Sequence, residues 1–170
     1  MAFSFPRPGR RQVDLPTVDR AVAALHLPEA IFKTSPWQPR DRVETGLRQW
    51  LRCCGAAIRD DQVIGMPSHA VDEAWHGFIL CTQIYAKFCE QAYGRFLHHF
   101  PEGVGDSTQN HGTMVEQLGR TVVAWSLVAR PDEECVLWDL DRTVGVEDPW
   151  GVDARHVAAV EERLRRAEPS

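Results

Sequence analysis

Residues 66–100, MPSHAVDEAWHGFILCTQIYAKFCEQAYGRFLHHF, decide the fold. Ser68 or His69 can cap the start of a helix, and Gly94 is a typical C-terminal cap. Between these signals the apolar residues cover most sides of a helix, as is typical of a helix in a protein core. The sequence therefore predicts one long central helix over about 69–93.

The rest of the chain shows helical patterns separated by proline and glycine. Further helices are expected from Thr17 or Asp19 to a stop near Pro28, and over 41–59, 112–130 and 152–166. No alternating strand pattern of useful length appears, so we predict an all-α fold, a single irregular bundle around the central helix. We expect residues 1–16 to form an extended arm and residues 17–167 to form one helical domain.

Composition narrows the class of protein. The net charge is -5, and no basic face stands out, which argues against nucleic acid as a partner. The chain shows neither a signal segment nor the roughly 20 apolar residues that cross a bilayer, so we expect a soluble, cytoplasmic protein. Arginine outnumbers lysine 17 to 2, a bias common in GC-rich bacterial genomes. The five cysteines show no metal-finger spacing, and we expect reduced, buried thiols.

Histidines concentrate between positions 69 and 111 and suggest a metal site. His69, Asp72 and His76 fall within an arc of about 60° on a helix and therefore share one stripe. Further ligands are available after the helix, from His98 or His99 and from His111. Side chains of neighbouring loop residues point in opposite directions, so we expect one of residues 98 and 99 to bind the metal.

Histidine and carboxylate ligands together suit Zn²⁺ or non-haem Fe²⁺. Asp72-Glu73-Ala74-Trp75-His76 resembles a zincin helix in which Asp replaces the first His, and this makes Glu73 the candidate acid/base. Glu73-x-x-His76 also fits half of a di-iron motif, with Asp153-x-x-His156 as its partner. The site predicts a small metal-dependent enzyme, hydrolytic or oxidative, whose partner is a small molecule or a protein.

A non-catalytic function is the alternative. The stripe lies opposite the main apolar face and can be solvated, with Asp72 placed favourably near the positive end of the helix dipole. His76 can bond a carbonyl, and His98-His99 can fasten the helix to its following loop. In that case the protein is a helical interaction or regulatory module.

Part of the chain resembles the glycine-rich domain-containing-protein-like family. The shared features are Val71–His76, Phe78–Leu80, Tyr85, Phe88-Cys89, Gly94 and His98–Pro101, with a looser resemblance of Leu137–Asp141 to small bacterial members. The resemblance implies a compact helical domain with Asp72, Trp75 and His76 at characteristic positions, and it implies no particular reaction. Plant members carry glycine-rich regions and are associated with growth and stress regulation, whereas the 12 glycines here are scattered.

Overall fold

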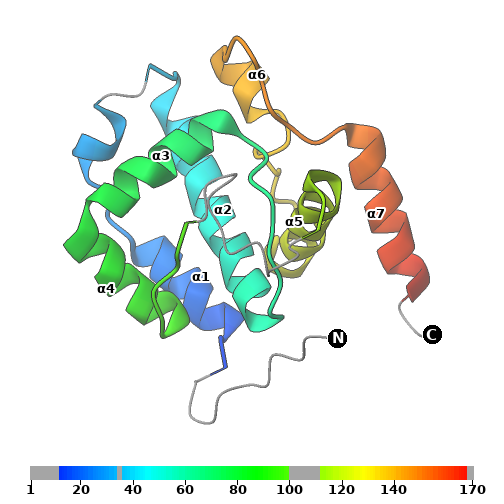
Figure 1. Cartoon of the computed structure of the whole chain (residues 1–170), viewed down its shortest axis with the longest axis horizontal. Coiled ribbons are helices and arrows are strands. Elements are labelled where there is room, and N and C mark those ends of the chain that lie inside the picture. Colours follow the sequence, from blue (N-terminus) through cyan, green and yellow to red (C-terminus); the bar gives the residue numbers. More distant parts are fainter. Residues whose placement is uncertain (1–11, 34–35, 100–111, 168–170) are drawn as a thin grey trace.

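The computed structural model describes residues 12–33, 36–99 and 112–167 (Figure 1). These residues form α1 (Leu15–Ala24), the 3-10 helix η1 (Glu29–Phe32), α2 (Arg40–Arg59), α3 (His69–Leu80), α4 (Thr82–Tyr93), α5 (Met114–Val128), α6 (Leu140–Val144) and α7 (Ala154–Ala167). No strand occurs within these ranges. The all-α prediction is confirmed.

The centre of the bundle is α2 and not the segment 69–93. α2 packs against α1, α3, α4, α5 and α6, and its residues from Gly46 to Ala57 are buried apart from Arg48 (Figure 1). Its apolar face, which includes Leu47, Trp50 and Leu51, is buried in the core. The opposite side is covered as well, because α5 and the chain after it pack there.

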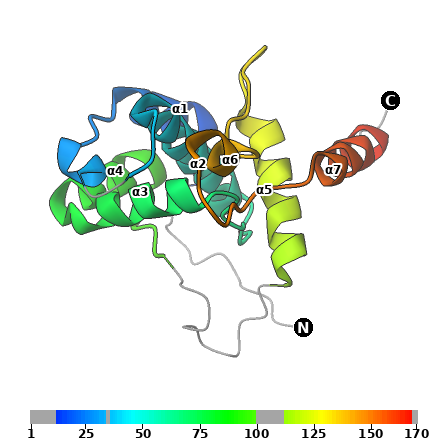
Figure 2. The ribbon, with the colours of Figure 1, turned by 90° about the horizontal axis from the view of Figure 1, so that it is seen from above.

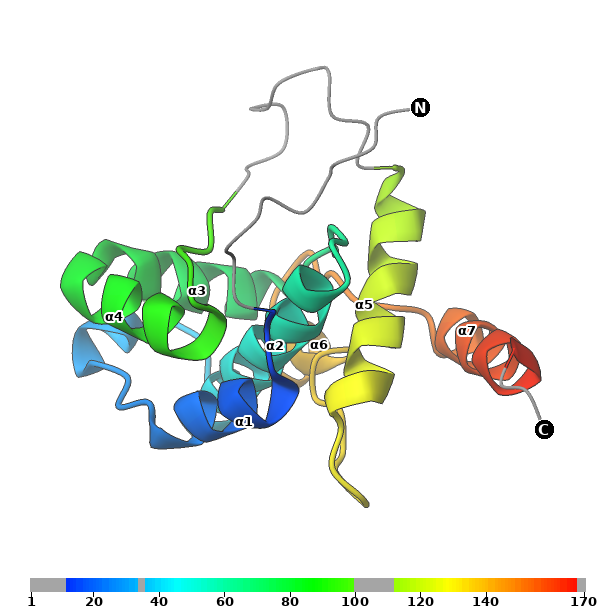
Figure 3. The ribbon, with the colours of Figure 1, turned by 90° about the horizontal axis from the view of Figure 1, so that it is seen from below.

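The predicted long helix is two helices. The chain leaves the helical conformation at Cys81 (φ -78, ψ 57) and changes direction between α3 and α4 (Figure 1). α3 packs against α2, η1 and α6, whereas α4 packs along α1, as Figure 3 shows from below. Apolar residues cover most sides of the segment, and a straight helix would leave part of them in water. The break lets each half bury its apolar face against different neighbours.

The other helix ends lie close to the predicted ones. α1 begins at Leu15, two residues before the earliest expected start, because the Asp14 carboxylate accepts a hydrogen bond from the Thr17 amide (3.0 Å). Pro16 is tolerated in that first turn. The expected arm therefore overlaps α1, and its residues 1–11 lie outside the described part. The single domain over 17–167 remains a prediction.

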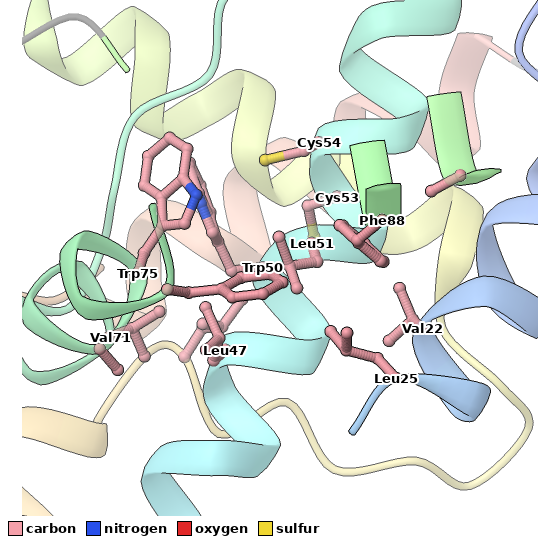
Figure 4. Packing of buried hydrophobic residues seen from close by; sticks show 14 of the residues in the cluster. Val22, Leu25, Leu47, Trp50, Leu51, Cys53, Cys54, Val71, Trp75 and Phe88 are labelled. Carbon is pink, nitrogen blue, oxygen red and sulfur yellow. The ribbon is translucent and has the colours of Figure 1, made fainter. Parts of the chain in front are cut away.

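The core joins α1, α2, α3 and α4, and Figure 4 shows its centre. Trp50 of α2 and Trp75 of α3 meet edge to face, with ring centroids 5.6 Å apart. α7 packs on α5, on the side away from α3 and α4 (Figure 2). Among the described helices, none combines the length and apolar character needed to cross a membrane.

Candidate metal centre

Three of the predicted ligands meet at the surface of α3. Asp72 and His76 lie one turn apart, and Oδ2 of Asp72 is 3.3 Å from Nδ1 of His76. The other carboxylate oxygen, Oδ1, lies 3.5 Å from Nε2 of His99. One donor atom from each of the three residues lies within 4.8 Å of the other two. We call these residues, Asp72, His76 and His99, the triad.

His99 reaches α3 because the chain turns back after α4. Gly94 adopts the left-handed conformation (φ 64) that a side chain would disfavour, and it ends α4. The following residues run back toward α3 (Figure 1), where the His99 ring lies 4.4 Å from the His76 ring. The His99 imidazole also packs edge to face on the indole of Trp75, with ring centroids 4.9 Å apart.

The distances within the triad suit a metal ion. Ligand atoms of a tetrahedral zinc site with bonds of about 2.1 Å lie about 3.4 Å apart. The Asp72 carboxylate approaches each imidazole at about that distance through a different oxygen, Oδ2 at 3.3 Å from His76 and Oδ1 at 3.5 Å from His99. The side chain of His76 is 48% exposed, whereas those of Asp72 and His99 are 17% and 19% exposed. The triad can therefore hold a metal ion with one side open to solvent.

Two other predicted residues lie at the start of α3 but have different partners. His69 contacts the rings of Trp37 and Trp150, at 6.1 and 5.1 Å. Glu73 lies 3.6 Å from His69 and accepts a 2.5 Å hydrogen bond from the Trp37 indole. The single stripe of three ligands therefore splits into two i,i+4 pairs, because the side chain of His69 is directed toward Glu73 and the two tryptophans.

The remaining candidates lie elsewhere. His98 is exposed and stacks on Phe96 (5.0 Å), so of the neighbouring pair only His99 joins the triad. His111 lies outside the described residues. His156, part of the alternative di-iron motif, lies on α7, which packs against α5.

Asp141 is a residue of the site region that the sequence did not single out for a function. Its carboxylate is 1% exposed and accepts hydrogen bonds from the Ser68 hydroxyl (2.7 Å) and the amides of His69 (2.8 Å) and Ala70 (3.1 Å). The amide of Trp150 also donates to it (2.8 Å). Asp141 thus fixes the start of α3 one turn before Asp72. Its sequence signal was only the resemblance of residues 137–141.

Four of the five cysteines, Cys53, Cys54, Cys89 and Cys135, are disfavoured as thiolate ligands. Cys53, Cys54 and Cys89 are buried, and burial is the main cause that raises the pKa of each thiol. Burial likewise raises the pKa of Cys135 to about 12. Among the described residues, the only cluster of three potential metal ligands is the triad, which contains no cysteine. Cys53, Cys54 and Cys89 are therefore buried thiols as expected, whereas Cys81 and Cys135 are only half-buried.

A comparison with family models places the chain. The model described as UCP032817-like matches residues 28–150, which is more than half of the chain. The chain belongs to the UCP032817-like family. No curated protein and no solved structure matches it significantly.

The UCP032817-like match covers the parts of the molecule that build the site. It includes α2 to α6, and therefore the whole triad, Tyr85 and Asp141, whereas α1 and α7 lie outside it. The description of the matching family does not mention the glycine-rich family that the motifs between residues 66 and 101 suggested. That resemblance remains an interpretation of those residues.

Proposed function

We propose that this UCP032817-like protein binds one divalent transition-metal ion, Zn²⁺ or Fe²⁺, through Asp72, His76 and His99. The observation that carries the proposal is the convergence of three donor atoms, from α3 and from the segment after α4, within 4.8 Å of one another. Two imidazoles and one carboxylate form a ligand set that both metals accept.

Among the described residues only three ligands converge, and this favours a reactive site over a structural one. Structural zinc sites are closed by four protein ligands, whereas sites with three protein ligands leave a position for water or a substrate. The exposure of the His76 side chain supports an open position at the surface. With Zn²⁺ such a site suits hydrolysis by activated water, and with Fe²⁺ it suits oxygen chemistry. Glu73 is left out of this chemistry, because it pairs with His69 and Trp37.

A metal-binding experiment tests the proposal directly. Untagged protein is stripped with a chelator and titrated calorimetrically with zinc chloride and, without oxygen, with ferrous iron. We expect one equivalent to bind. His76→Ala and His99→Ala should weaken binding by more than the about 10–100-fold typical of outer-shell changes, because each removes a ligand.

His98→Ala is the matched control, since residue 98 is the sequence neighbour of His99 but stands outside the triad. It should bind metal like the wild type, and so should His69→Ala. Circular dichroism verifies that every variant keeps its helices. Equal losses in His98→Ala and His99→Ala would contradict the ligand assignment.

A second candidate function has an observation in its favour. Asp72 lies within 3.5 Å of both imidazoles, so the triad can also hold the segment after α4 against α3 by contacts of the carboxylate with the two imidazoles, without a metal. The protein would then be a non-catalytic helical module. Wild-type protein that binds neither metal, yet loses stability in His99→Ala, supports this candidate and overturns the first.

A further inference from the structure

We infer that Tyr85 is a positioning residue of the proposed metal centre, which holds His99 within reach of Asp72 and His76. The inference rests on the proposed function. The side chain of Tyr85 is completely buried, so it does not line the site. It acts on the site through its hydrogen bonds.

The Tyr85 hydroxyl joins the two structures that support His99. It donates a 2.8 Å hydrogen bond to the carbonyl of Leu97, two residues before His99. It also accepts a hydrogen bond from the indole of Trp75 (3.3 Å), the ring on which His99 rests. One oxygen therefore fixes both the backbone that leads to His99 and the aromatic surface beneath its imidazole.

The tyrosine itself is held rigidly. Its ring packs edge to face on two phenylalanines, Phe78 of α3 at 5.0 Å and Phe96 at 5.2 Å. Phe96 belongs to residues 95–99, which run back toward α3 after Gly94 and are called the returning segment. Burial raises the pKa of the hydroxyl, so it keeps its proton and remains a donor to Leu97. A donor that neither moves nor ionises is well suited to keep a metal ligand in place before the metal arrives.

The segment has another anchor, which lies farther from His99. The guanidinium of Arg95 donates to the carbonyl of Ile58 at the end of α2 (3.1 Å). That contact fixes the segment four residues before His99. The hydrogen bond from Tyr85 holds Leu97, only two residues before His99, and the same hydroxyl also bonds Trp75. Loss of this hydroxyl should therefore displace the His99 imidazole more than loss of the Arg95 contact.

Tyr85→Phe removes the hydroxyl and keeps the ring. Tyr93→Phe is the matched control, because Tyr93 lies on the same helix, is 3% exposed and donates a bond of the same length to the Leu51 carbonyl (2.8 Å), in the core. Zinc affinity should fall about ten-fold in Tyr85→Phe, at the lower end of losses seen for outer-shell partners, and stay within about two-fold in Tyr93→Phe.

A readout that needs no metal accompanies the titration. Trypsin can cleave the Arg95–Phe96 bond when the returning segment opens, and mass spectrometry identifies that cut. Metal-free Tyr85→Phe should be cut there faster than the wild type and Tyr93→Phe. Circular dichroism verifies that Tyr85→Phe and Tyr93→Phe keep their helices before either measurement.

The outcomes separate this inference from the proposed function. Zinc binding by the wild type with equal affinity in Tyr85→Phe and Tyr93→Phe overturns the role of Tyr85 and leaves the metal site standing. A wild type that binds neither metal overturns the metal site, and faster cleavage in Tyr85→Phe then shows an anchor without a metal function. Equal losses in both tyrosine variants would mean a general effect of stability and overturn the positioning role.

Discussion

At the scale of single residues, Asp141 shows how one buried carboxylate can fix a helix start. Its carboxylate accepts four hydrogen bonds, from the Ser68 hydroxyl and from the backbone amides of residues 69, 70 and 150. The negative charge also lies at the positive end of the α3 dipole. An isolated charge in this position would be costly, and the four hydrogen bonds compensate for the lost hydration.

Asp141→Asn should destabilise the protein by about 3 kcal/mol, since in either orientation the amide nitrogen would face at least one backbone N–H group, which can only donate. Urea unfolding followed by circular dichroism measures the change. Asp139→Asn is the control, because Asp139 is exposed and its side chain caps no helix. It should stay within about 0.5 kcal/mol of the wild type. Similar losses in both variants would show that Asp141 has no special role.

The residues of the triad were predictable in part. Asp72 and His76 follow from the i,i+4 spacing, which is a local property of a helix. The choice of His99 over His98 depends on Trp75, which lies more than twenty residues earlier in the chain. His69 shares the spacing but pairs with Glu73, because Trp37 and Trp150 surround it. Such long-range contacts leave no pattern in a single sequence.

At the scale of elements, the helices were predicted better than their connections. The bounds of α2, α5 and α7 lie within two residues of the expected ones, because their apolar periodicity and end signals are local. The helix breaks at Cys81 although neither proline nor glycine stands at or beside that position. It follows from tertiary packing, since α3 and α4 bury their faces against different helices. Helix propensity alone cannot reveal such a break.

The segment after α5 shows the same limitation, because buried polar residues of α2 hold it. Arg52, 4% exposed, donates to both carboxylate oxygens of Glu133 (2.7 and 2.9 Å). The side chain of Gln49 donates to the Glu134 carbonyl (2.8 Å) and accepts from the Val136 amide (2.9 Å). Polar side chains on a helix ordinarily indicate a solvated face. Here the side chains of Arg52 and Gln49 mark a docking site for another segment.

The contact between Arg52 and Glu133 predicts that stability depends on pH. Burial alone would raise the pKa of Glu133, but hydrogen bonds from the Arg130 amide and the Arg52 guanidinium hold it below its ordinary value. A lowered pKa in the folded state adds stability above the unfolded pKa, and that stability disappears as the pH falls through the folded value.

Glu133→Gln should therefore cost about 2–3 kcal/mol at neutral pH, because it leaves the buried Arg52 with only the more exposed Asp19 as a counter-ion. The difference from the wild type should shrink as the pH falls below 4.5, the ordinary pKa of a glutamate, and through the lower pKa of Glu133 in the folded protein. Urea unfolding across this range measures it. Glu134→Gln is the control, since that side chain is 73% exposed. A difference that does not change with pH would contradict the role of the Glu133 charge.

At the scale of the whole molecule, the bundle is held together by close approaches to α2. Gly55 of α2 lies against Val18 of α1, and a β-carbon there would come within 2.8 Å of both valine methyl groups. Val18 is 1% exposed and β-branched, so it has little room to rotate away. α1 in turn packs along α4, which ends at the turn leading to His99. The spacing between α1 and α2 thus affects the elements that build the site.

Gly55→Ala should destabilise the protein by about 1–2 kcal/mol, because overpacking exceeds the gain in helix propensity of about 1 kcal/mol. Gly119→Ala on α5 is the matched control, since its added methyl group would meet only the His156 ring, at an ordinary 3.6 Å. That variant should gain about 0.5–1 kcal/mol from propensity alone. Urea unfolding of both variants compares the two signs. A Gly55→Ala variant as stable as Gly119→Ala would show that α1 and α2 can separate freely, and that their spacing is not set by this contact.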